Sequence, residues 1–211
     1  GITAIKGDAF RIGSTGRYPA AAALLTSVTL PDSLVCIEGG AFFDQTELAG
    51  ELIIPALVSD IAGSYTASSF QNSKITKITV LSNTGSPVLT VGDYAFANMQ
   101  YLEEIHCERP IVLGQNSFQN DAMLTVVSLP EMTGEISEGA FMACSNLKTL
   151  TIPEGVVSTG QNQGGNGFFS GTGIKELLFP ATFITAGVNL SKDSKLENIA
   201  FLSGNLSFLS K

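Results

Sequence analysis

The stretch ISEGAFMACSNLKTLTIP, residues 136–153, contains the pattern that decides the fold. It begins with an aliphatic residue, three spacers, a small residue and a phenylalanine, which run from Ile136 to Phe141. An alternating run, Leu150-Thr151-Ile152, follows and ends at Pro153. Alternation of apolar and polar side chains is typical of a short strand with one buried face. Proline ends such a strand because it has no amide hydrogen to give to a neighbour.

The same pattern recurs along the chain. The segment from the aliphatic residue to the phenylalanine is repeated at residues 5–10, 37–42, 91–96 and 113–118. The alternating runs begin at residues 28, 52, 78, 105, 127, 150, 177 and 199, so successive runs lie 22 to 27 residues apart. A period of roughly 20–29 residues is that of leucine-rich repeats. Such a repeat is too small to close its own core, so repeats stabilise one another by stacking.

These observations predict a right-handed leucine-rich repeat solenoid, α/β and rich in β-structure, that forms a single domain over residues 1–211 with about eight repeats. Each repeat is expected to contribute one short parallel strand, with turns and short helical segments on the opposite side. Pro19 and the alanines that follow predict a helical insertion near residues 18–25, and residues 198–209 predict a capping hairpin. The phenylalanines of the repeated segment are expected to form one aromatic column: Phe10, Phe42, Phe70, Phe96, Phe118, Phe141 and Phe168.

Composition narrows the function classes. The chain has 11 lysines and arginines against 19 aspartates and glutamates, a formal charge of −8, which argues against nucleic acid as a partner. Its apolar stretches, such as residues 20–25 and 52–58, are too short to predict a membrane span. The three cysteines, Cys36, Cys107 and Cys144, are widely spaced and predict buried free thiols rather than a disulfide framework or a zinc site.

The sequence contains few residues that could form a catalytic site. The single histidine, His106, is expected to project outward beside Glu104, but the register turns Cys107 toward the core, so no nucleophile completes a dyad. Neither the carboxylates nor the glycines of residues 164–167 form a metal or phosphate motif. The sequence therefore predicts a protein that is not an enzyme, with no catalytic residue, no metal and no cofactor.

What remains is the outward face of the predicted strands, which is frequently the binding side of a leucine-rich repeat solenoid. Its members are small hydroxyl residues, aliphatic residues and isolated charges, and they make up the candidate protein-binding face: Ile53, Lys77, Thr79, Glu104, His106, Val126, Ser128, Thr149, Thr151, Glu176 and Leu178. The face lacks the Trp, Tyr and Arg anchors that usually dominate binding energies. A merely solvated β-surface is the alternative.

The repeated segments resemble the BspA-like class of leucine-rich repeats, with the pattern L-x-x-I-x-I-P followed by I-G-x-x-A-F-x-x-C-x-x-L. Residues 136–153 are the best copy and place Cys144 at the cysteine position, whereas the other copies lack that cysteine and three lack the proline. The resemblance extends from Ile5 to about Phe201 and implies a bacterial protein at the cell surface or secreted, outside the cytoplasm. It also implies adhesion to a protein ligand such as a host matrix or surface protein.

Two alternatives stay open beside protein binding. The chain could be a structural spacer that holds another domain away from the envelope. Glycan binding is the weaker alternative, because it needs exposed aromatic platforms and the tyrosines Tyr18, Tyr65, Tyr94 and Tyr101 are scattered through the sequence.

Overall fold

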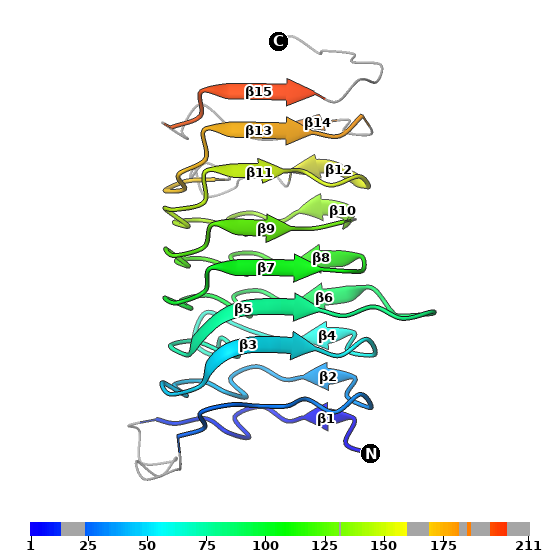
Figure 1. The fold of residues 1–211 in the computed structure, drawn as a ribbon, viewed down its shortest axis with the longest axis vertical. Coiled ribbons are helices and arrows are strands. Elements are labelled where there is room, and N and C mark those ends of the chain that lie inside the picture. The colour runs from blue at the N-terminus through cyan, green and yellow to red at the C-terminus, as the bar shows by residue number, and fades with distance from the viewer. Residues whose placement is uncertain (14–23, 131, 160–168, 182–184, 187–194, 202–211) are drawn as a thin grey trace.

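Short parallel strands stack in two columns and form a β-solenoid (Figure 1). The computed structural model describes residues 1–13, 24–130, 132–159, 169–181, 185–186 and 195–201. Over these residues the strands are β1 (Ala4–Ile5), β2 (Cys36–Ile37), β3 (Ala49–Ile54), β4 (Asp60–Ile61), β5 (Lys74–Val80), β6 (Leu89–Val91), β7 (Glu104–Cys107), β8 (Ile111–Leu113), β9 (Val126–Ser128), β10 (Met132–Ile136), β11 (Thr149–Thr151), β12 (Val156–Thr159), β13 (Glu176–Phe179), β14 (Thr185–Ala186) and β15 (Asn198–Phe201).

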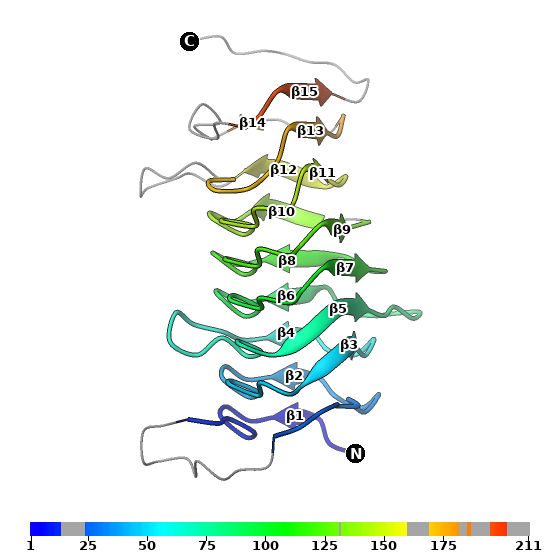
Figure 2. The ribbon, with the colours of Figure 1, turned by 60° about the vertical axis from the view of Figure 1, so that its left-hand side comes forward.

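The strands of the two columns alternate along the chain. One column is a continuous sheet in the order β1-β2-β4-β6-β8-β10-β12-β14, and the other consists of two sheets, β3-β5-β7-β9 and β11-β13-β15. Figure 2 shows the columns side by side, with the chain crossing from one to the other in every repeat. A repeat in the middle of the stack therefore has two strands, and the expectation of one strand per repeat is wrong. The additional strand ends at the aliphatic residue that opens the repeated segment, as in Leu89–Val91 and Ile111–Leu113.

The connections between the columns are turns. No helix occurs in the described parts of the chain, so the expected helical segments opposite the outward strands are absent there. Most of the proposed helical insertion near 18–25 lies outside the described residues. Of the proposed hairpin at 198–209, the structure describes only β15, which pairs in parallel with β13, and residues 202–209 lie outside the described chain.

The core lies between the two columns and is lined by alternate residues of each strand. In β7, Ile105 and Cys107 are buried, while Glu104 and His106 lie on the outer side. The predicted aromatic column is confirmed from Phe10 to Phe141: successive rings stack nearly parallel with centroids 4.9–5.7 Å apart. Phe168 lies outside the described residues.

Two turn positions, one on each side of the repeated phenylalanine, have a left-handed backbone in most of the described repeats. At one of them Asp44, Asn72, Asn98 and Asn120 have φ between 61° and 65°. Asparagine and aspartate tolerate this conformation better than other side chains because they form local hydrogen bonds. Here the amides also bond from repeat to repeat: Asn72 Nδ2 donates to Asp44 Oδ1 at 2.7 Å and Asn120 Nδ2 to Asn98 Oδ1 at 2.9 Å. The turns therefore contribute to stacking as well as to chain reversal.

The position that holds Cys144 in the best copy is a buried site of varying polarity in the other repeats. Gln45 fills it near the N-terminus, where its amide donates to the Phe10 carbonyl, and Asp121 fills it one repeat before Cys144. Asp121 is fully buried, accepts a hydrogen bond from the Met99 amide through Oδ1 at 2.8 Å, and leaves Oδ2 without a partner among the described residues. Burial raises the pKa of the Asp121 carboxyl well above its ordinary value.

This carboxyl makes stability depend on pH. Because the folded state holds the Asp121 proton above the pH at which the unfolded chain releases it, folding is expected to weaken as pH rises above about 4. The Asp121→Asn variant keeps the shape of the side chain but cannot become charged. The free energy of unfolding of the variant, relative to that of the wild type, should therefore increase between about pH 4 and pH 7. Urea unfolding at several pH values measures this difference. Glu103→Gln, at an exposed glutamate, is the control for the loss of a surface carboxylate. A difference for Asp121→Asn that stays constant with pH would contradict the prediction.

A buried arginine joins the turns of three successive repeats. Arg109 is 3% exposed and follows β7. Its Nε donates to the Leu81 carbonyl at 2.9 Å, Nη2 donates to the Val58 carbonyl at 2.6 Å, and Nη1 donates to the Pro87 carbonyl. Burial lowers the pKa of the guanidinium, which has neutral carbonyls instead of a carboxylate around it.

The cysteines are free, as the sequence predicts, but not equally buried. Cys107 and Cys144 lie in the core, whereas Cys36 is only half-buried. Cys36 is at the outward position of β2, in register with Asp60 of β4 and, one strand further, Thr90 of β6, and neither of these is buried. The expectation of three buried thiols is therefore wrong for Cys36.

Candidate protein-binding face

The candidate face is the outer surface of the column formed by β3, β5, β7, β9, β11 and β13. Pairing registers align its predicted members, together with Glu51, in two rows. One row runs Glu51, Lys77, Glu104 and Val126 and the other Ile53, Thr79, His106 and Ser128. In the second sheet Thr149 pairs with Glu176 and Thr151 with Leu178. The structure thus brings the predicted residues together within each sheet, because the pleat of a strand sends alternate side chains to the same side.

We call the sheet β3-β5-β7-β9 the lower sheet, and its charged side chains contact one another. Lys77 Nζ lies 3.2 Å from Glu51 Oε1, and the Thr79 hydroxyl donates to the same carboxylate. The Thr79 hydrogen bond is the main cause that lowers the pKa of Glu51, with the Lys77 contact second. His106 Nε2 lies 3.1 Å from Glu104 Oε2, as the register predicted. Because these pairs are partly exposed, each contributes little stability, and they mainly fix the orientation of the side chains.

Apolar side chains interrupt the polar rows. Ile53 is 47% exposed and Val126 is 40% exposed, while Leu178 is half-buried. The hydroxyls of Thr149, Thr151 and Ser128 lie on exposed positions between them. A surface of separated aliphatic residues, hydroxyls and paired charges suits a broad contact with another macromolecule better than the enclosure of a small molecule.

Cys107 does not form a catalytic dyad with its neighbour His106, because the two side chains lie on opposite sides of β7. Cys107 faces the core, where burial raises the pKa of its thiol to about 12 and so keeps it protonated. In the described chain, no group of three or more His, Cys, Asp and Glu side chains is placed to hold a metal ion. A helix of the length and hydrophobicity needed to cross a bilayer is also missing from those residues.

Sequence reasoning missed an aromatic pair outside the face. The rings of Tyr65 and Tyr94 meet edge to face with centroids 5.5 Å apart, and Tyr65 is 78% exposed. Tyr94 has a φ of 57°, which is uncommon for a bulky residue. Tyr65 and Tyr94 are therefore distant in the sequence but in contact in the structure. The one sequence signal was the insertion of polar residues 64–69, which contains Tyr65.

Comparisons with known proteins agree with the solenoid. The family model described as "BspA type Leucine rich repeat region" matches residues 20–112 and 63–197 in six copies. A search among curated proteins gives no match. A solved structure, that of a leucine rich cell surface protein from Faecalibacterium prausnitzii A2-165, is similar at 20% identity and a TM-score of 0.51, with 96% of this chain and 58% of that chain covered. That likeness shows the fold, and this chain spans little more than half of the other protein. The repeats, their stacking and the family match together place the chain in the BspA-type leucine-rich repeat family.

Proposed function

We propose that this chain is a non-enzymatic, protein-binding module of a bacterial protein that is displayed on the cell surface or secreted. The outer face of β3, β5, β7, β9, β11 and β13 carries the binding. The observation that supports this most is the register of the strands, which gathers side chains from distant repeats into two aligned rows. The family and the similarity to a cell surface protein support the location outside the cytoplasm.

The partner on this face is a folded protein, such as a matrix or surface protein of a host. A solenoid presents an extended surface without a deep cavity, which matches the broad interfaces of protein complexes. The exposed aliphatic residues Ile53 and Val126 supply the apolar contacts, and the fixed pairs Glu51–Lys77 and Glu104–His106 supply directional polar contacts.

A double substitution tests the face. Ile53→Asp combined with Val126→Asp places two charges among the apolar contacts and is expected to weaken binding by tenfold or more, which corresponds to about 1.4 kcal/mol. Surface plasmon resonance against a panel of purified extracellular matrix proteins measures the effect. The matched control is Val35→Asp combined with Val88→Asp, two valines of similar exposure (40% and 39%) outside the face, which should change affinity less than twofold. Equal binding by both variants, or no binding by the wild type at about 100 µM, would contradict the proposal.

A spacer is the second candidate function, and one observation favours it. The charged residues of the lower sheet are already paired with one another, which leaves few groups that demand a partner. The similar cell surface protein is also longer than this chain, so further domains could be held by the stack. A wild type that binds no member of the panel, together with flanking domains that do, would favour the spacer. The Tyr65–Tyr94 pair supplies an aromatic patch for a glycan, and a glycan array tests it directly.

A further inference from the structure

The outward column is interrupted between β9 and β11. Continuation of the register would place Val126 beside Thr149, yet no pairing joins the two strands, and the column divides into sheets of four and three strands. Figure 1 shows β9 and β11 farther apart than their neighbours. We call this break, between Thr125–Val127 on one wall and Lys148–Thr149 on the other, the seam.

Backbone groups on both walls of the seam lack the partners that other repeats have. The Thr125 and Val126 amides both donate to the Glu103 carbonyl, at 2.9 and 3.1 Å. Two repeats further on, the amides of Glu197 and Asn198 donate in the same way to the carbonyl of Lys175. At the seam neither the Lys148 nor the Thr149 amide donates to the Thr125 carbonyl within the described hydrogen bonds. Such open donors and acceptors are what an extended polypeptide satisfies when it adds to a sheet edge.

Packing at the seam is looser than in neighbouring repeats. Val127, the inward residue of β9, is only half-buried, whereas the equivalent Ile105 and Leu150 are at most 2% exposed. A shallow pocket of about 280 Å³ opens there, lined by Thr125, Asn146, Lys148 and Thr149. The opposite column stays joined through β10, which has five residues where β8 has three and shifts register against both neighbours. The seam is thus a local opening in a stack that remains continuous.

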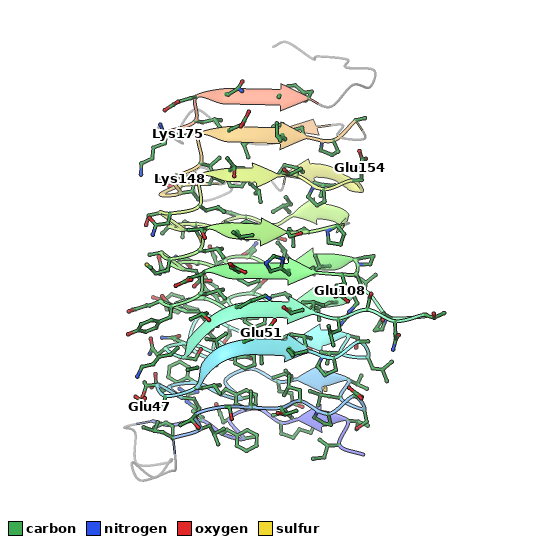
Figure 3. All side chains as sticks on the ribbon, in the orientation of Figure 1. Glu47, Glu51, Glu108, Lys148, Glu154 and Lys175 are labelled. Carbon is green, nitrogen blue, oxygen red and sulfur yellow. The ribbon has the colours of Figure 1, made fainter. Side chains whose placement is uncertain are left out.

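The charge at the seam is positive and unpaired. Lys148 has no acidic partner among the described residues, whereas Lys74, Lys77 and Lys175 each contact a glutamate within 3.2 Å. Figure 3 places Lys148 and Lys175 at the same edge of the column, where the strands begin. The pocket lining otherwise consists of hydroxyl and carboxamide groups, so a carboxylate is the ligand group that complements it.

We infer that the seam receives an extended, acidic segment of the partner protein, which adds as a strand between β9 and β11. Its carbonyls accept from the Lys148 and Thr149 amides, one of its amides donates to the Thr125 carbonyl, and an acidic side chain pairs with Lys148. The inference rests on the proposed protein-binding function and names the chemistry of the partner. Main-chain bonds give such an interaction its affinity, and the lysine gives it a preference for acidic sequences.

Hydrogen exchange tests the seam without any ligand. In the free protein, the Lys148 and Thr149 amides should exchange about 100-fold faster than the Thr125 and Val126 amides, which occupy the equivalent positions one repeat earlier. Amide exchange followed by NMR measures both pairs in the same sample. Equal protection of the two pairs would show that the ladder is closed in solution and would overturn the inference.

A synthetic peptide tests the occupant. The probe is acetyl-Glu-Val-Thr-Val-Thr-amide. Its control has the same side chains with N-methyl groups on alternate backbone amides, so one of its two edges cannot pair and it cannot bridge two neighbouring strands. The probe should protect the Lys148 and Thr149 amides and bind at least tenfold tighter than the methylated peptide. Lys148→Met should weaken the probe about fivefold, while Lys175→Met, which removes a lysine paired with Glu197, should not.

The outcomes separate this inference from the proposed function. Equal binding of the two peptides, or protection that appears elsewhere, overturns the strand addition. If matrix proteins then still bind the wild type and lose affinity to the Ile53 and Val126 double variant, the face binds partners and only the seam is refuted. If the probe binds the seam as expected while no matrix protein binds, the seam stands and the folded partner proposed for the face is refuted.

Discussion

The Phe96→Ala variant is expected to lose about 3–5 kcal/mol of its free energy of unfolding. Phe96 is 1% exposed and lies between two rings, with centroid distances of 5.5 Å to Phe70 and 5.3 Å to Phe118. Removing the ring takes away its buried apolar surface and leaves a cavity that the two stacked neighbours can fill only in part. Chemical unfolding followed by circular dichroism measures the loss.

Position in the stack supplies the control for this prediction. Phe10 belongs to the same column but is 45% exposed, and among the described residues it has a stacked ring on one side only, at 5.2 Å from Phe42. Phe10→Ala should therefore cost roughly 1–2 kcal/mol. Phe96→Leu, which retains most of the volume, should also cost less than Phe96→Ala. If truncation at Phe10 were as costly as truncation at Phe96, the column would not act as a chain of neighbour contacts.

The outward strands could be predicted from the sequence because their alternation is long enough to be recognised. Runs such as Leu150-Thr151-Ile152 show period two, and the pleat then fixes which side chains share a face. The strands of the opposite column escaped prediction because β1, β2 and β4 have two residues each, too few to display a period. In the sequence, the aliphatic residues of these strands were recognised only as the first residues of the repeated segments that end in phenylalanine, and not as parts of strands.

The seam could not be predicted from the sequence. The runs that begin at residues 127 and 150 are 23 residues apart, within the range found at the other repeats. Whether two neighbouring strands pair depends on the path of the chain through the opposite column, and here the five-residue β10 shifts register against β8 and β12. Contacts between Tyr65 and Tyr94 depend on turn geometry in the same way. Local sequence patterns determine which residues face outward, but not how closely successive repeats approach.

Arg109 illustrates a residue whose role the sequence concealed. An arginine that follows a strand in a soluble chain is usually solvated, since arginine is rarely buried without a partner. In this structure its guanidinium meets the carbonyls of Val58, Leu81 and Pro87, for which no other hydrogen-bond donor is found among the described residues. The planar fork of five N–H groups is what allows one side chain to reach carbonyls from several repeats.

Replacing this arginine should therefore destabilise the stack strongly. Arg109→Met keeps the length of the side chain but leaves three carbonyls without a donor, at a cost of about 1–3 kcal/mol for each that water cannot reach. We expect a total loss of about 3 kcal/mol or more, with faster amide exchange in the turns around residues 55–58 and 81–89. Arg109→Lys should recover only part of the loss, because an ammonium group cannot reproduce the fork.

A surface lysine provides the comparison that isolates the effect of burial. Lys74 is partly exposed and pairs with Glu47 at 2.9 Å. Lys74→Met also removes one positive charge, but it should lower the free energy of unfolding by less than about 1 kcal/mol. Denaturant unfolding measures the free energy of unfolding of both variants, and the comparison shows whether the buried arginine contributes more than the surface lysine. Should Arg109→Met cost no more than Lys74→Met, the three carbonyls would have to find water in its absence, and the arginine would not hold the repeats together. If Arg109→Met costs more than Lys74→Met, the stability of the lower sheet depends on a side chain that joins several repeats. The phenylalanine column joins successive repeats in the same way.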